Sequence, residues 1–298
     1  MAGIGWKSVQ VLSTPPTSST TTLPLFPNLH NLKCEYTERA MPLLHMPLPS
    51  LTFLIIGIDS DLFSQNHSFP NFSPNLSALV VDVGSSDTFS LIEANYVYRW
   101  QNLCSVVCPQ SAFDADALVH LSRMPALTEL EFALNTTFPL AASHSPLVFS
   151  NLHNFTLHSK SLEPISQSLS QVRPPVITDF GAIIRTCPSR QELSSFFASV
   201  QTFNAGRTIE RLRLHQKPIH FSDLPQTSLE YPELCLEDLR PCTSFNLRQL
   251  SLDIEWDIGL TDSDLLTLAS AWPHLERLVI NMKRGWNTRG GITLDGLL

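Results

Sequence analysis

Charged residues are scarce in this sequence. They make up 15% of its 298 residues, against about a quarter in a typical soluble domain. The balance is acidic, with 27 Asp and Glu against 19 Lys and Arg and a net charge of −8. This argues against a phosphate-binding surface as the main function, so nucleic acid is not expected as a partner.

Long apolar runs are also missing. The longest, Leu51 to Ile58, is too short to cross a bilayer, and Met1 to Ser13 holds no segment that could serve as the apolar part of a secretory signal. We therefore expect no membrane association and a cytoplasmic or nuclear location.

The residue patterns of most catalytic and metal sites are absent too. The six cysteines form no Cys-x-x-Cys pair and the ten histidines no His-x-x-x-His, so neither a zinc site nor a disulfide framework is predicted. No nucleophile elbow, Walker loop or dinucleotide fingerprint is found. The densest acidic group, Asp253 to Asp264, lacks the spacing of a calcium loop. We expect no catalytic residue, no metal and no cofactor, and hence not an enzyme.

What the sequence does contain is a repeated unit, clearest between Phe245 and Met282. An alternating segment with Leu247 is followed by a helix pattern from Thr261 to Ala271 and by a second alternating segment with Leu275. The period from Leu247 to Leu275 is 28 residues, inside the 20 to 29 residues of leucine-rich repeats.

The same template recurs along the chain as an apolar residue followed three and five positions later by two more. The nine copies are Leu29/Leu32/Cys34, Leu51/Leu54/Ile56, Leu76/Leu79/Val81, Leu103/Val106/Cys108, Leu127/Leu130/Phe132, Leu152/Phe155/Leu157, Ile209/Leu212/Leu214, Leu247/Leu250/Leu252 and Leu275/Leu278/Ile280. In five of the nine, Pro stands two residues before the first apolar position, where it is tolerated at a strand entry.

Helix signals lie between some of these segments. Asp114 to Ser122 carries acids suited to a helix start, Ser189 opens a capping box for a helix through Val200, and Thr261 caps a third helix with Leu265, Leu266 and Leu268 on its buried side. The long gap between the sixth and seventh copies is expected to be an irregular helical section at about 161–205, either a distorted pair of repeats or a helical insertion.

These patterns predict an α/β protein, an irregular leucine-rich-repeat solenoid with short parallel strands on the concave face and helices and loops on the convex face. Residues 1–22 are expected to be a disordered leader and 23–298 the solenoid. The last residues, Gly290 to Leu298, resemble the start of a further unit with no polar cap, so we expect a truncated C-terminal end.

The stretch from Asp253 to Leu298 (DIEWDIGLTDSDLLTLASAWPHLERLVINMKRGWNTRGGITLDGLL) resembles the C-terminal repeats of fungal F-box and leucine-rich-repeat proteins. The resemblance implies repeats that select the substrate of a ubiquitin ligase adaptor, so that the partner is a protein and a ubiquitylation substrate. No F-box pattern precedes Leu29, which puts recruitment of a cullin adaptor in doubt.

Because side chains alternate along a strand, residues between the apolar ones should face the concave surface. We predict a partner-binding strip of mixed charge there; the alternative is a polar face that serves solubility only. The strip consists of Glu129, Glu131, His158, Arg211, Arg213, His215, Asp253, Glu255, Arg277 and Asn281.

A competing interpretation is a parallel β-helix enzyme acting on polysaccharide, whose turns recur at a similar spacing. It needs carboxylates clustered on adjacent turns and no helices, which the helix pattern from Thr261 to Ala271 disfavours.

Overall fold

The computed structural model describes residues 26–36, 48–58, 75–83, 90–92, 97–98, 101–135, 146–173, 176–205, 207–217, 232–282 and 291–292. The expected leader at 1–22 lies outside these residues, as do positions 293–298 at the end of the chain.

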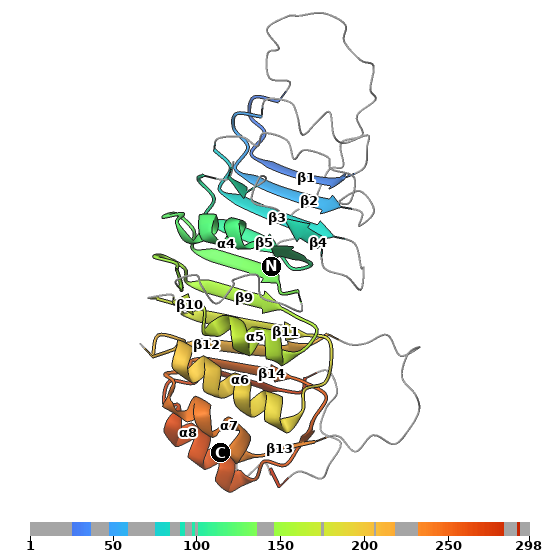
Figure 1. Cartoon of the computed structure of the whole chain (residues 1–298). Helices are drawn as coiled ribbons and strands as arrows, with labels where there is room; N and C mark the ends of the chain where they lie inside the picture. The colour runs from blue at the N-terminus through green and yellow to red at the C-terminus, as the bar shows by residue number, and fades with distance from the viewer. Residues whose placement is uncertain are drawn as a thin grey trace, which may run out of the picture.

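Ten strands form one parallel sheet, and their order across the sheet is their order along the chain (Figure 1). They are β1 (Asn31–Tyr36), β2 (Phe53–Ile58), β3 (Ala78–Val83), β5 (Ser105–Cys108), β7 (Glu129–Ala133), β9 (Asn154–His158), β11 (Asp179–Ile184), β12 (Arg211–Gln216), β14 (Gln249–Asp253) and β16 (Arg277–Ile280). Parallel neighbours need a connection that crosses back to the starting end of the sheet. The parallel sheet and the mixed α/β class expected from the sequence are confirmed.

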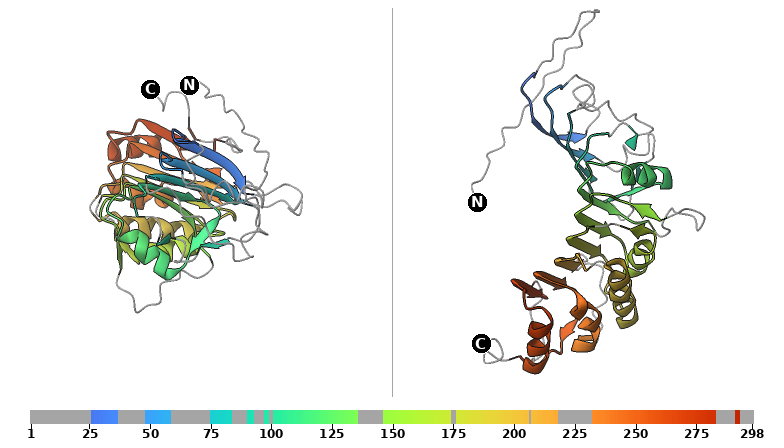
Figure 2. Two further views of the ribbon diagram at one scale, coloured as in Figure 1. Left: turned by 90° about the horizontal axis from the view of Figure 1, so that it is seen from above. Right: turned by 90° about the vertical axis from the view of Figure 1, so that its left-hand side faces the viewer.

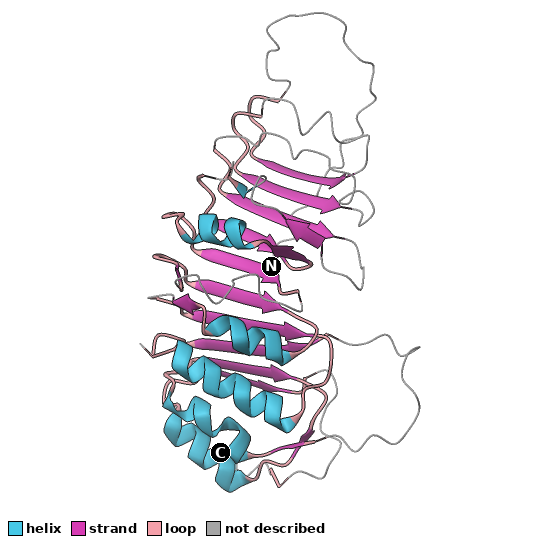
Figure 3. Ribbon diagram, viewed as in Figure 1, coloured by secondary structure: helices cyan, strands magenta, loops and turns pink. Residues whose placement is uncertain are grey.

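Helices cover one side of this sheet, and the sheet follows an arc with the helices on its outer side (Figures 2 and 3). The described helices are α4 (Ala115–Ser122), α5 (Leu162–Leu169), α6 (Arg190–Phe203), α7 (Leu236–Leu239) and α8 (Asp262–Ala271), with a 3-10 helix, η2, at Arg240–Ser244. Outside the large sheet, three pairs of short parallel strands link segments that connect its strands. These pairs are β4 (Ser90–Ile92) with β6 (Ser111–Phe113), β8 (Leu147–Val148) with β10 (Val172–Arg173), and β13 (Glu233–Leu234) with β15 (Asp257–Ile258).

One backbone contact recurs at the entry to every strand after the first. The carbonyl oxygen of the residue just before a strand accepts two N–H groups from the equivalent positions of the next strand. Thr128 O, for example, accepts from His153 N–H at 2.9 Å and from Asn154 N–H at 3.0 Å. The same pair of bonds is made at all nine junctions between neighbouring strands of the large sheet. Each strand of the large sheet therefore begins at the same position relative to the strand before it.

Each of the nine apolar triplets marks a strand of the sheet. Its first residue lies two positions before the strand, and its second and third residues are the second and fourth residues of the strand. Seven of these triplets, those of β2, β3, β5, β7, β9, β12 and β14, are buried in one continuous core. Those of β1 and β16 are only partly buried, because each of these strands has a neighbour on one side only within the described sheet.

The section 161–205 needs a correction. It holds α5 and α6, but between them lies β11, a full member of the sheet paired with β9 and β12. Ile177, Phe180 and Ala182 form a tenth triplet at the same spacing, and all three are buried. Of the two readings of this section, the structure therefore favours further repeats over a helical insertion.

The centre of the core is aromatic. Phe132 of β7, Phe155 of β9 and Phe180 of β11 occupy the buried positions of consecutive strands, with ring centroids 6.1 and 6.0 Å apart. Phe180 also packs against Phe196 and Phe203 of α6, at 6.3 and 5.6 Å. Helix and sheet are held together here by large apolar surfaces.

The predicted helix starts are confirmed. Asp114 caps α4, and capping boxes at Ser189 and Thr261 start α6 and α8. One detail is wrong: Leu266 of α8 is 65% exposed while Leu268 is buried, so the apolar stripe of α8 is narrower than its sequence indicates. Among the described helices, none combines the length and the apolar character needed to cross a membrane.

Candidate functional site

The candidate site is the sheet surface opposite the helices. On each strand the triplet residues point into the core, and the residues that alternate with them form the other surface, which we call the inner face. In β12, Leu212 and Leu214 are completely buried, whereas Arg211 is exposed and Arg213 and His215 are half-buried. The inner face therefore consists of rows of side chains that run across the strands.

All ten predicted strip residues lie on or just after strands of this sheet, namely β7, β9, β12, β14 and β16. The structure does not bring them together as one continuous strip, because β11 lies between β9 and β12. Arg211 is thus opposite Asp179 on one side and Gln249 on the other. Arg277 is exposed on the last strand, opposite Gln249.

On the inner face, the carboxylate of Asp179 is paired with two arginines. Its carboxylate oxygens lie 3.0 Å from Arg211 Nε and 2.9 Å from an Arg213 terminal nitrogen. Gly181 stands directly opposite Arg213, and a Cβ at position 181 would lie 2.8 Å from Thr156 Oγ1. The side chain of Thr156 therefore fills the space above Gly181. The two guanidinium groups of Arg211 and Arg213 share the carboxylate of Asp179.

A second polar contact joins β7 and β9. His158 Nε2 lies 2.7 Å from Glu131 Oε1, and the His158 side chain is 5% exposed. Both residues belong to the predicted strip. Because the His158 side chain is buried, it contributes to a partner surface mainly by holding Glu131 in place.

Further contacts order the rest of the face. Ser105 donates to Glu129 Oε2 at 2.6 Å, and His215 Nε2 lies 2.9 Å from Ser251 Oγ. Asp253 and Glu255 are only 9% and 8% exposed, so these two predicted residues offer a partner little surface.

Asn281 is a correction to the predicted strip. Its side chain is 1% exposed, and its amide accepts from Ile254 N–H at 3.2 Å and donates to Trp256 O at 2.5 Å. Its φ of 49° lies in the left-handed region, which Asn tolerates better than most residues. Asn281 therefore satisfies buried backbone groups and is not available to a partner.

Asp179 was missed by the sequence interpretation because its strand was missed. Ala182 is a small member of the triplet, and Gly181 is a poor strand former, so the segment does not look like a strand. The signal was nevertheless present: Ile177, Phe180 and Ala182 keep the spacing, and Pro175 stands two residues before the first of them.

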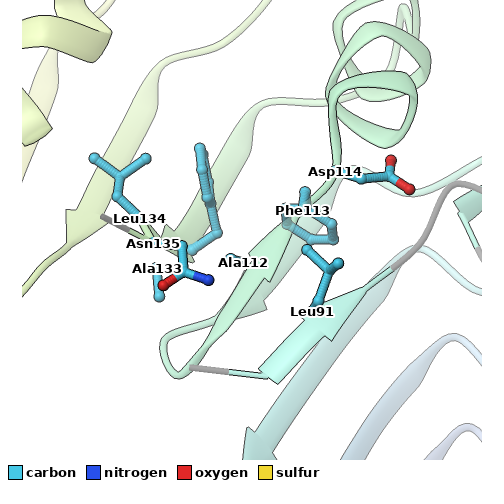
Figure 4. A pocket seen from close by; sticks show the side chains of 8 residues that line it. Leu91, Ala112, Phe113, Asp114, Ala133, Leu134 and Asn135 are labelled. Carbon is cyan, nitrogen blue, oxygen red and sulfur yellow. The ribbon is translucent and has the colours of Figure 1, made fainter. Parts of the chain in front are cut away.

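A separate hollow of about 230 Å³ opens beside β6 and β7 (Figure 4). Its lining is mostly apolar: Leu91, Ala112, Phe113, Asp114, Phe132, Ala133, Leu134 and Asn135. The carboxylate of Asp114 already accepts from Ala117 N–H at the start of α4. The hollow thus lacks the set of converging polar groups that marks a site of chemistry.

Metal-binding and thiol chemistry find little support in the described ranges. No three His, Cys, Asp or Glu side chains within them gather closely enough to hold a metal ion. Burial raises the pKa of the Cys34 thiol to about 11 and also raises the pKa of Cys108 and Cys242. These thiols are protonated near neutral pH and pack as small apolar residues.

The arrangement can therefore hold charged side chains in a fixed pattern over a long curved surface. No protein-family model matches the chain, and no curated protein shows significant similarity to it.

Proposed function

We propose that the chain is an irregular leucine-rich-repeat solenoid that recognises another protein through its inner face, without catalysis. The observation that carries the proposal is the strand-entry contact that recurs at all nine junctions of the sheet. Units that contact only their neighbours in this way build solenoids, and the curved face that results is the usual binding surface of such proteins.

The helices favour this proposal over a parallel β-helix enzyme. A β-helix needs no helices, whereas α6 packs against Phe180 of β11 through Phe196 and Phe203, and α5 contributes Leu162, Ile165 and Leu169 to the same core. Two carboxylates of the inner face are paired with bases: Glu131 with His158, and Asp179 with Arg211 and Arg213.

The inner face is suited to a partner of mixed charge. Arg211 and Arg213 are 48% and 39% exposed while being held by Asp179. Fixed guanidinium groups lose little conformational entropy on binding, and Arg is common among the residues that dominate protein interfaces. Charge complementarity would steer the partner and set its register.

The resemblance of the last repeats to fungal F-box and leucine-rich-repeat proteins extends the proposal. On that basis the partner is a ubiquitylation substrate in the cytoplasm or nucleus. Recruitment of a cullin adaptor would require a segment other than the repeats. Recovery of such an adaptor together with the partner would support this extension, and recovery of the partner alone would oppose it.

The test combines affinity purification with two matched variants. The tagged full chain is purified from native cells, its main partner is produced separately, and the Kd of the complex is measured. Arg211→Gln removes an inner-face guanidinium. Arg248→Gln removes one of similar exposure, 52% against 48%, that lies at a strand entry and pairs with Glu210 and Glu276.

We expect Arg211→Gln to weaken the complex about tenfold, a typical cost for a central interface Arg, and Arg248→Gln to leave it unchanged. Equal effects of the two variants, or none from Arg211→Gln and Arg213→Gln together, would overturn the inner face as the binding surface.

A further inference from the structure

The inner face changes character along the sheet. The first and third residues of each strand belong to this face, and in β12 they are Arg211 and Arg213. In β2, β3 and β5 the same positions are mostly apolar. Five side chains make up this region, which we call the apolar patch: Phe53, Ile55, Ala78, Val80 and Val107.

The sheet register joins the patch into one surface. Phe53 lies opposite Ala78. Ile55 lies opposite Val80, which lies opposite Val107. At a strand spacing of about 4.8 Å, the row from Ile55 to Val107 is about 10 Å long. The patch is therefore a continuous surface and not a set of scattered residues.

The side chains of the patch do not serve the core. All five are half-buried, and none belongs to the continuous core or to the apolar side chains packed against it. Val, Ile and Phe favour strands, but β7, β9, β12 and β14 belong to the same sheet with Glu, Asn, Thr, Arg, Gln and Ser at the equivalent positions. Contiguous apolar surface on an open face is typical of interaction sites.

Two carboxylates border the patch on β7. Glu131 lies directly opposite Val107 and is paired with His158. Glu129 accepts a hydrogen bond from Ser105 Oγ at 2.6 Å, which holds its carboxylate at the edge of the patch. Glu129 has no ion pair with any residue that the structure describes. It is thus the carboxylate that a cation from a partner can meet.

Shape and charge restrict what can cover the patch. The patch lies on the inside of the arc (Figure 2), and the same surface of a second copy would be equally concave. Two such faces meet at their rims and leave the patch uncovered, so the occupant must be a narrow segment. The net charge of −8 favours the approach of a basic segment over an acidic one.

We propose that the apolar patch binds a segment of the protein partner in which aliphatic side chains stand next to a Lys or Arg. The aliphatic side chains would cover Ile55, Val80 and Val107, and the cation would meet Glu129. This inference rests on the proposed function, because it places the partner on the inner face and names the chemistry by which part of it is recognised.

The test uses the full chain and a fluorescently labelled peptide of Leu and Lys, with Ser–Lys and Leu–Glu peptides of equal length as controls. Fluorescence anisotropy gives the Kd. We expect only the Leu–Lys peptide to bind. Val80→Thr with Val107→Thr should weaken it about tenfold, because each change replaces a methyl group by a hydroxyl and keeps the β-branched shape. Glu129→Gln should weaken it by a smaller factor.

Two matched variants serve as controls. Val279→Thr makes the same change at the third residue of β16, a half-buried position in the same row of the inner face but far from the patch. Glu210→Gln removes a carboxylate at a strand entry, where it pairs with Arg248. Both should leave the Kd of the Leu–Lys peptide unchanged. Thermal unfolding shows that each variant is folded before its Kd is compared.

Failure of the Leu–Lys peptide to bind, or an equal loss from Val279→Thr, would overturn the proposal. Equal binding of the Ser–Lys peptide would overturn it too, because charge alone would then account for binding. Analytical ultracentrifugation tests a second copy as the occupant: a dimer that Val80→Thr with Val107→Thr turns into a monomer would contradict the proposal. None of these outcomes changes the Arg211→Gln result with the purified partner, so the proposed function can stand where this inference fails.

Discussion

The carboxylate of Asp179 on β11 lies 3.0 Å from the guanidinium of Arg211 on β12, and the same carboxylate holds Arg213. The Asp179 side chain is 13% exposed, and those of the arginines are 48% and 39% exposed. One mostly buried carboxylate thus positions two guanidinium groups on the inner face of the sheet.

Asp179→Asn tests the strength of this cluster. The change keeps the volume but removes the charge that both arginines share. Because the arginines are partly exposed, we expect a loss of about 1 kcal/mol in the free energy of unfolding. The loss should shrink between about 0.1 M and about 1 M salt, where the screening length falls from about 10 to about 3 Å. Urea unfolding at both salt concentrations measures it.

The control for this change is Glu210→Gln. Glu210 is 45% exposed and pairs with Arg248 at 3.5 Å, so we expect a loss below about 0.5 kcal/mol. If both variants lost the same amount, the Asp179 cluster would be no more than an ordinary surface pair.

Thr261→Ala tests whether the capping box starts α8. Thr261 Oγ1 accepts from Asp264 N–H, and the Asp264 carboxylate accepts from Thr261 N–H at 2.8 Å. Its loss should cost about 1 kcal/mol in the free energy of unfolding. Ser161 stands at the same position before α5 but makes no capping bond, so Ser161→Ala should change stability little. A larger effect at Ser161 would contradict this account.

Phe180→Ala tests whether the stack unfolds as one unit. Phe180 is completely buried between Phe155 and the α6 residues Phe196 and Phe203. We expect a loss of about 3–5 kcal/mol in the free energy of unfolding. In a stack with contacts only between neighbours, a weakened central unit should also separate unfolding into two steps. Circular dichroism together with Trp fluorescence would detect them, because the five Trp residues are unevenly distributed along the chain.

The control for Phe180→Ala is Leu278→Ala. Leu278 lies on the end strand β16 and is 38% exposed, so its loss should cost less and leave a single transition. A single transition for Phe180→Ala at an unchanged midpoint would oppose a stack held by its central aromatic residues.

The sequence was sufficient to place nine of the ten strands because each carries a triplet of large apolar residues at a fixed spacing. It failed at β11, where the triplet ends in Ala182 and Gly181 weakens the strand signal. Ala182 is nevertheless completely buried, with Leu157 and Leu214 as its partners on the neighbouring strands, and this context comes from other segments of the chain. A pattern read along one segment does not contain it.

The inner face was predictable from alternation, but exposure was not. Alternation places His158, Asp253 and Glu255 on the correct side of the sheet, yet their exposure depends on how closely neighbouring strands bring other side chains. The order and the arc of the strands (Figure 2) are not contained in the pattern of a single strand. For the same reason the pairing of Asp179 with Arg211 could not be foreseen without the strand order.

Two substitutions at Asn281 distinguish a structural role of this residue from a role in partner binding. Asn281→Ala removes the amide that satisfies Ile254 N–H and Trp256 O, which should cost about 1–3 kcal/mol. Ala also tolerates a φ of 49° less well than Asn, because it lacks the short polar side chain that can hydrogen-bond locally in this conformation. Asn281→Gly also removes the amide, but Gly adopts this positive φ without strain. It should therefore be more stable than Asn281→Ala. Urea unfolding of the two compares them directly. Equal stability would show that the backbone conformation carries no cost, and a loss of partner binding by a fully folded Asn281→Gly protein would return Asn281 to the binding surface.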